Sequence, residues 1–148
     1  MYTIGEMAKQ LNIAPSTLRF YDREGLLPFV QRSEGGIRVF SESDYRWLKM
    51  ICCLKCAGMS LKDIKRYIQM AMQGDETVDE RLKMFEDQRR KLQAQMEELQ
   101  QTLDIVDYKC WYYQTAKEIG SEEAISQLPE EEVPEPYRAV RRILMGHG

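Results

Sequence analysis

The sequence predicts a mainly α-helical fold in two parts: a small helical head that carries one β-hairpin, and a long helix of coiled-coil type. Three observations predict it. Short amphipathic segments separated by caps and turns fill residues 1–75, a Gly35-Gly36 pair interrupts them, and an apolar repeat without glycine or proline occupies residues 76–119. Heptad-type apolar spacing is typical of coiled coils. Residues 120–148 are then expected to form a short C-terminal tail and a candidate effector element.

The first two predicted helices are short and meet at a tight break. Thr3 can cap the first helix, whose apolar residues recur at helical spacing: Ile4, Met7, Ala8 and Leu11. Pro15 suits the first turn of the second helix. Leu18 and Tyr21 mark the inward face of that helix, and Gly25 suits a left-handed cap at its end.

A hairpin and two further helices complete the predicted head. The Gly35-Gly36 pair supplies the hairpin turn. Ser41 begins a third helix with a capping box that runs to about Gly58, and Ser60 caps a fourth that ends near Gly74. Two helices at a tight turn followed by a hairpin indicate a winged helix-turn-helix, in which the second helix enters the major groove of duplex DNA.

The charge distribution agrees with a DNA-binding head. The net charge is −3, but residues 1–75 hold eleven Lys and Arg against eight Asp and Glu, whereas residues 76–148 hold ten against sixteen. A basic head suits contact with phosphate at one end. No apolar run is long enough to span a bilayer and no signal peptide is visible, which favours a cytoplasmic protein without membrane partners.

An enzyme is not expected. His147 is the only histidine, and neither a nucleophile–base set nor a glycine-rich phosphate loop is present. We therefore expect no catalytic residues.

The segment 76–119 predicts a dimer. Its apolar positions alternate by four and three for five heptads, and a lone helix could not bury such a stripe. The predicted dimer seam contains Leu82, Phe85, Leu92, Met96, Leu99, Leu103 and Val106, and the same spacing includes Arg89 and Cys110. Because Arg89 would face its own copy in a parallel pair, an antiparallel homodimer is favoured.

The head resembles the MerR family of transcriptional regulators. The resemblance is carried by the ordered motifs Thr3-Ile4-Gly5-Glu6-Met7-Ala8, Thr17-Leu18-Arg19-Phe20-Tyr21-Asp22, Gly25-Leu26-Leu27 and Gly36-Ile37-Arg38-Val39-Phe40. It extends through Gly58-Met59-Ser60-Leu61 and covers about residues 1–115. It implies an antiparallel coiled-coil homodimer with two winged heads. Such dimers underwind and bend promoter DNA with a long spacer so that RNA polymerase can use it.

The candidate DNA contacts follow from chemistry and from the resemblance. Arg19 on the second helix can bind guanine or clamp a phosphate, while Ser16 and Thr17 lie at the N-terminus of that helix, where phosphate binds. The other candidates are Tyr21, Arg23, Arg32 and Arg38. Tyr21 also fits core packing, and Arg23 and Arg32 also fit solvated surface charge. Phe20 and Ile37 stand where the family often has tyrosine.

Four cysteines offer a signal input. Cys53 is placed similarly to the single cysteine of the aldehyde- and thiol-stress-sensing branch of MerR regulators, and Lys49 and Lys55 nearby favour a reactive thiolate. Buried filler is the alternative for Cys53 and the preferred interpretation of Cys52 and Cys56. Thiolates suit Zn or Cu(I), yet metal-sensing and iron–sulfur relatives carry their cysteines in a loop after the dimer helix. No such set occurs here, so we expect no metal and no cofactor.

Two other inputs remain open. Cys110 is expected in the seam as core, and an antiparallel pair would carry it toward the Cys53 of the other subunit. Tyr108, Trp111 and Tyr112 form an aromatic group with Tyr113 that could line an apolar or cationic ligand site. Packing against the tail or the partner is the alternative for these rings. The effector is unknown on either interpretation.

A rival function is an architectural or excisionase-like DNA binder that senses no effector. Such proteins are usually short and lack a long dimer helix. The heptad repeat of residues 76–119 therefore favours the regulator.

Overall fold

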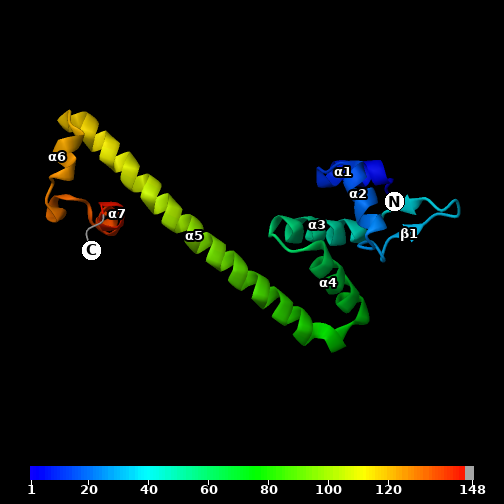
Figure 1. The fold of residues 1–148 in the computed structure, drawn as a ribbon. Coiled ribbons are helices and arrows are strands. Elements are labelled where there is room, and N and C mark those ends of the chain that lie inside the picture. Colours follow the sequence, from blue (N-terminus) through cyan, green and yellow to red (C-terminus); the bar gives the residue numbers. More distant parts are fainter. Residues whose placement is uncertain (146–148) are drawn as a thin grey trace. The chain divides into compact units, whose positions relative to one another are not determined.

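The computed structural model describes residues 1–145, and the chain divides into two compact units, residues 1–89 and 90–148. Figure 1 shows the order of the elements along the chain. Within the described residues, no helix is long and apolar enough to cross a membrane. His147, the only histidine in the sequence, lies outside the described part.

Helices α1 (Ile4–Leu11) and α2 (Pro15–Arg23) begin and end as the sequence predicts. Thr3 and Glu6 form a capping box at the start of α1. Asn12 ends α1 with a left-handed φ of 56°, and Pro15 is the first residue of α2. Gly25 follows α2 with φ 75° and lets the chain turn back under the helix.

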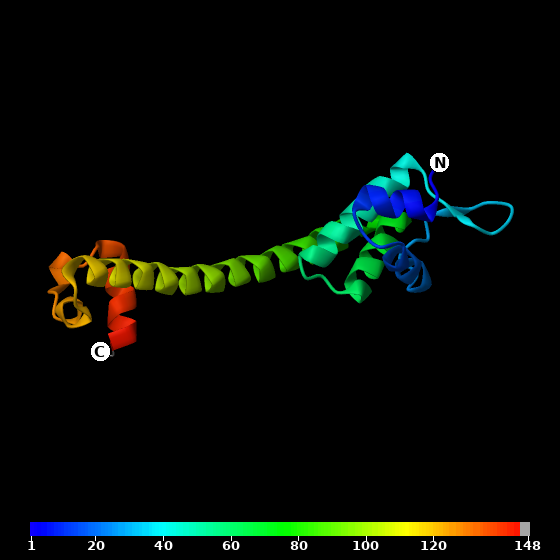
Figure 2. The same cartoon turned by 90° about the horizontal axis from the view of Figure 1, so that it is seen from above.

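Strands β1 (Gln31–Arg32) and β2 (Arg38–Val39) form the antiparallel hairpin, with Arg32 paired to Arg38. The turn between them contains Gly36 at φ 77°. An isolated bridge joins Tyr2 to Phe40, so the base of the hairpin is tied to the start of the chain. Figure 2 shows the hairpin loop projecting from the helices of the head, as a wing does.

Helices α3 (Glu42–Cys56) and α4 (Leu61–Gln73) close the head. A Ser41–Asp44 capping box starts α3, and Ser60 caps α4. Buried side chains from α1 to α4 and from the hairpin arm form one core, which includes Met7, Leu18, Leu26, Leu27, Phe40, Leu48, Ile51, Ile64 and Ile68. Helices α3 and α4 therefore share one core with the inner faces of α1 and α2.

The 3-10 turn η1 (Asp75–Thr77) leads into α5 (Val78–Ile119). The first turns of α5 pack on the head: Phe85 meets Tyr67 edge-on at 5.0 Å between ring centres, and Met84 also contacts the core. The compact first unit therefore ends at Arg89 rather than at the change of sequence pattern near residue 75. Gln88 adds a hydrogen bond of 2.8 Å from Nε2 to the carbonyl of Ala57.

The second unit contains α6 (Glu122–Ser126), the 3-10 turn η2 (Glu130–Glu132) and α7 (Glu135–Met145) beside the end of α5. Its core is formed by Tyr108, Ile125, Val133 and Val140. Val133, in the acidic and proline-rich segment 129–136, is only 1% exposed and anchors that segment.

Candidate nucleic-acid interface

Helix α2, the predicted recognition helix, has two distinct faces. Leu18 and Tyr21 are buried in the head. The opposite face is exposed at every position of one helical stripe, which consists of Ser16, Arg19, Phe20 and Arg23. Thr17 is half-buried beside it. Among the described residues no side chain caps the N-terminus of α2, where Pro15 has no amide N–H and the Thr17 amide donates to the carbonyl of Ala14 at 2.9 Å.

Tyr21 packs inward, as the core-packing alternative holds. Its side chain is 6% exposed. Burial raises the pKa of the Tyr21 hydroxyl, and the neighbouring Cys52 and Cys56 side chains raise it further. Tyr21 therefore stays protonated, and its ring packs in the core that Ile51 and Leu54 of α3 share.

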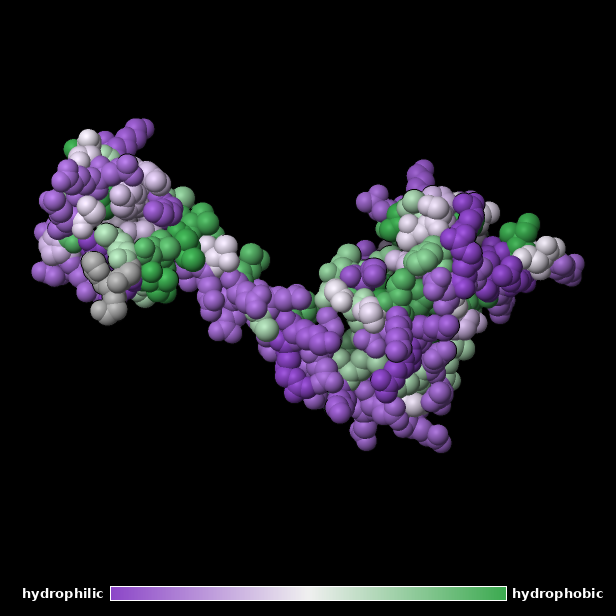
Figure 3. Space-filling model, in the orientation of Figure 1, coloured by the Kyte–Doolittle hydropathy of each residue, from purple (hydrophilic) through white to green (hydrophobic). Residues whose placement is uncertain are grey.

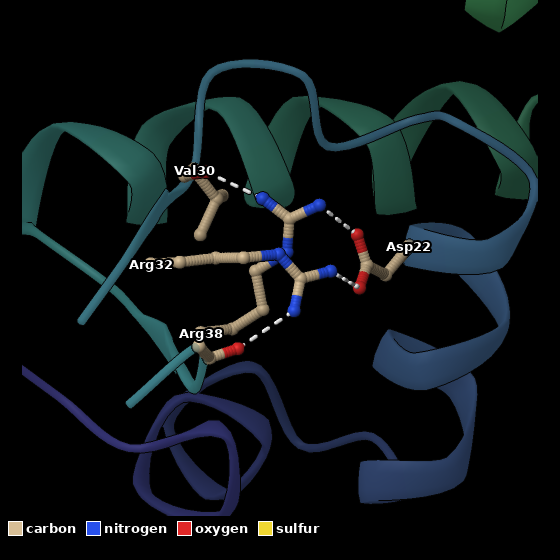
Figure 4. Close-up of polar contacts among 5 residues, drawn as sticks. Asp22, Val30, Arg32 and Arg38 are labelled. Atoms are coloured by element: carbon tan, nitrogen blue, oxygen red, sulfur yellow. Dashed lines mark hydrogen bonds and ion pairs between the residues drawn. The ribbon is translucent and has the colours of Figure 1, made fainter. Parts of the chain in front are cut away.

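Asp22 on α2 binds both arginines of the wing (Figure 4). Arg38 donates from one guanidinium nitrogen to a carboxylate oxygen of Asp22 and from the other to the carbonyl of Val30. Arg32 donates to the second carboxylate oxygen at 3.4 Å and to the carbonyl of Gly36 at 2.8 Å. One carboxylate thus holds the wing against the recognition helix.

Both terminal nitrogens of each wing arginine have partners within the chain, but the two side chains differ in exposure. The Arg38 side chain is only 21% exposed, both terminal nitrogens have partners within the chain, and its Nε is buried without one among the described residues. The Arg32 side chain is 53% exposed. Arg38 therefore positions the wing, whereas Arg32 retains a face toward solvent. Sequence reasoning missed Asp22 because it lies ten and sixteen residues from its partners.

The thiols of the head lie at the end of α3. Cys53 and Cys56 are exposed and Cys52 is half-buried. The interpretation of Cys56 as buried filler is therefore wrong, and so is that alternative for Cys53. Burial raises the pKa of Cys52, and the thiols of Cys53 and Cys56 raise it further, against a smaller lowering by Lys49. No cluster of three metal-ligating side chains occurs within residues 1–145.

The aromatic group lies in the second unit and is largely packing. Tyr108 is 2% exposed and is surrounded by Trp111, Tyr112 and Tyr137 at ring distances of 5.9, 6.1 and 6.3 Å. Trp111 also stacks on Tyr137 of α7 at 5.7 Å. The alternative in which these rings pack the tail is thus the one that fits, with Trp111 and Tyr112 half-buried at its edge.

The predicted seam of α5 is largely exposed on the single chain. Met96 and Leu99 are 71% and 70% exposed, and Leu103 and Val106 are about half exposed. Leu82 is exposed and Leu92 half-buried, while Phe85 packs on the head. Figure 3 shows hydrophobic residues gathered over the C-terminal half of α5. Cys110 was expected to be a core residue of the seam, and it is exposed in the single chain. A seam residue is exposed in this way when its helix has no partner.

Comparison with known proteins agrees with this geometry. Residues 2–71 match the family described as "MerR HTH family regulatory protein", and residues 45–107 match "MerR, DNA binding". An uncharacterized HTH-type transcriptional regulator of Haemophilus influenzae is 47% identical over 131 residues, which is 87% of this chain and 97% of the relative.

Two solved structures have the same fold. One is HiNmlR, "a MerR family regulator lacking the sensor domain, bound to promoter DNA", with 48% identity, a TM-score of 0.70, and coverage of 83% of this chain and 98% of that one. The other is a putative MerR family regulator of Listeria monocytogenes, with 28% identity, a TM-score of 0.76, and coverage of 85% and 96%. The chain is a DNA-binding transcriptional regulator rather than an enzyme, and it belongs to the MerR family.

Proposed function

We propose that this chain binds promoter DNA as a homodimer and changes transcription in response to a thiol-reactive signal. The observation that carries the DNA-binding part is the exposed stripe of α2, opposite a buried face and next to a wing fixed by Asp22. Arg19 reads a base or clamps a phosphate, and Arg23 lies one turn further along the same stripe. HiNmlR, which is similar over most of both chains, was solved on promoter DNA.

The contacts to the backbone follow from the same geometry. Ser16 and Thr17 stand in the first turn of α2, which no side chain of the described residues caps, and their hydroxyls can bind phosphate there. Arg32 reaches the flanking backbone with its exposed guanidinium, whereas Arg38 contributes by holding the wing in place. Tyr21 contributes by supporting α2 from below.

The dimer is supported by the exposed apolar stripe on α5. Met96 and Leu99 are largely exposed to solvent on the single chain. Because an apolar heptad stripe of this length is normally buried against a partner helix, this exposure favours a dimer. Pairing in the antiparallel direction, which Arg89 favours, sets two wings apart on one face of the duplex. Two bound heads can then bend and underwind the DNA between them so that RNA polymerase engages the promoter.

The proposal of a thiol-reactive signal is supported by the exposure of Cys53 to solvent. Cys53 is exposed on α3, so a reagent can reach it. The rival input, a ligand held by the aromatic group, loses support because Tyr108 is enclosed by its neighbours. Cys110 is a further exposed thiol that an antiparallel partner would bring toward the opposite head.

The test begins with the DNA. Purified reduced protein selects duplexes from a random library, and the selected operator is then used in footprinting, light scattering and in vitro transcription. We expect dimers, a protected site with distorted central base pairs, and an output that changes after mild aldehyde treatment. Cys53→Ser should abolish that change and Cys110→Ser should preserve it. A monomer, or a wild-type output that the aldehyde leaves unaltered, contradicts the corresponding part of the proposal.

A further inference from the structure

Three thiols occupy the last two turns of α3, and they are not equivalent. Cys53 and Cys56 are exposed, whereas Cys52 is half-buried. Burial raises the pKa of Cys52, and the thiols of Cys53 and Cys56 raise it further, so Cys52 stays a protonated and poorly nucleophilic thiol. Of the three thiols on α3, Cys53 and Cys56 are therefore the two that a reagent can reach.

The spacing of this pair suits bond formation after a small distortion. Residues three apart in a helix have Cβ atoms about 5–6 Å apart, while a disulfide needs about 3.8 Å. Cys56 is the last residue of α3, and Gly58 follows with φ 84°. The final helical turn can tighten there without breaking the helix interior.

That same turn touches both functional parts of the head. The carbonyl of Cys53 accepts from the amide of Ala57 at 2.9 Å, and the carbonyl of Ala57 accepts from Gln88 of α5 at 2.8 Å. On its inner side, α3 contributes Ile51 and Leu54 to the core that also contains Tyr21 of α2, and the Cys52 and Cys56 side chains help to raise the pKa of Tyr21. A change in the conformation of this turn would therefore displace groups that contact α2, the helix proposed to read DNA, and α5, the helix proposed to pair the subunits.

We propose that Cys53 and Cys56 form a dithiol site that a hydroperoxide closes into a disulfide, and that closure shifts α2 and α5 through Tyr21 and Gln88. The proposal rests on the proposed function in that DNA binding is the output. It differs from a single-thiol sensor because Cys56 is required.

The chemistry balances with the peroxide as oxidant. One thiolate attacks a peroxide oxygen, the O–O bond breaks, and a sulfenic acid forms as water or an alcohol leaves. The second thiol attacks the sulfenic sulfur and expels water as the S–S bond forms. The two thiols lose two electrons and two protons in total, and the peroxide receives them.

The chain offers a direct assay for the bond. Trypsin cleaves after Lys49, Lys55 and Lys62, so Cys53 and Cys56 fall on different peptides. Full-length reduced protein is treated with hydrogen peroxide, its free thiols are blocked, and it is digested without reduction. The disulfide holds peptides 50–55 and 56–62 together within one chain, and Cys52→Ser, the matched control, should preserve this link. Cys53→Ser and Cys56→Ser should abolish it.

Two further measurements connect the bond to the output. Hydrogen exchange of α2 and of the first turns of α5 should quicken on oxidation in the wild type and in Cys52→Ser. Affinity for the selected operator should change at least about fivefold, the lower end of common coupling energies. Cys56→Ser should show neither effect.

The outcomes separate this inference from the proposed function. A response to aldehyde that survives in Cys56→Ser, together with linked peptides in the wild type, supports both. Unlinked peptides, a link between two chains, or a link that leaves hydrogen exchange unaltered overturns the dithiol switch and leaves the DNA-binding function standing. If no operator can be selected, the proposed function fails, while the peptide link and hydrogen exchange still decide the switch.

Discussion

The ion pairs of Asp22 with Arg32 and Arg38, which we call the Asp22 clamp, give a quantitative prediction. Asp22→Asn removes the charge that both wing arginines bind and nearly preserves the shape of the side chain. Asp22 and Arg38 are both 21% exposed, so their burial is intermediate between that of surface and buried ion pairs. Surface pairs contribute about 0.2–1 kcal/mol to stability, whereas breaking a buried pair costs about 3–5 kcal/mol. We therefore expect Asp22 and Arg38 to couple by about 1–3 kcal/mol. Arg32 is 53% exposed and 3.4 Å away, so its coupling should stay below about 1 kcal/mol.

The assay is a pair of double-mutant cycles on the full chain. Asp22→Asn is combined with Arg38→Gln or with Arg32→Gln, and the free energy of unfolding is measured in urea. Trp47 stacks on Phe29 in the head at 5.6 Å, so its fluorescence follows the head. A Trp111→Phe background removes the signal of the second unit.

A matched control comes from α4 and α5. Arg66 and Glu80 are both more than 60% exposed and 4.0 Å apart, so their coupling should be close to zero. Two results would contradict this prediction: a coupling of Arg32 to Asp22 as strong as that of Arg38, or an Asp22–Arg38 coupling no larger than the control. Either result would mean that burial does not set the strength of the clamp.

Three further predictions follow from the same structure. Leu103→Asp should convert the dimer to monomers in light scattering, whereas Gln100→Asp, an exposed change outside the seam, should leave dimers. Iodoacetamide should alkylate Cys53 faster than Cys52 near neutral pH, because burial raises the pKa of Cys52. The difference between the two alkylation rates should narrow as the pH rises and Cys52 ionises. Mass spectrometry of the Cys52→Ser and Cys53→Ser variants would measure the two rates. Arg141→Gln removes the guanidinium that reaches three backbone carbonyls near the end of α6, and it should lower the melting temperature of the second unit at a cost of about 1–3 kcal/mol.

Much of the head could be predicted because its signals are local. Thr3, Ser41 and Ser60 each cap a helix within three residues, and Gly25 and Gly36 adopt the positive φ that a turn requires. The spacing of Leu18 and Tyr21 correctly gave the buried face of α2. Such short-range rules need no knowledge of the tertiary structure.

The parts that sequence reasoning missed depend on distant partners. Arg38 was expected to face DNA, but the fold brings Asp22 and the carbonyl of Val30 to its guanidinium. The apolar pattern of α5 predicted one continuous seam, yet Phe85 packs against Tyr67 of the head. Val133 lies in an acidic, proline-rich segment that gives no apolar periodicity, so its burial could not be foreseen.

The central claim is that the exposed stripe of α2 reads duplex DNA, and Arg19 tests it most directly. We would titrate the selected operator with wild type, Arg19→Ala and Lys117→Ala, a charge-matched control on the last turn of α5, at one fixed salt concentration. We expect Arg19→Ala to weaken binding by about 1–3 kcal/mol, which is roughly five- to 150-fold, and to leave the protein dimeric. Lys117→Ala should bind as the wild type does. An Arg19→Ala protein that binds the operator with wild-type affinity would contradict the assignment of the recognition helix.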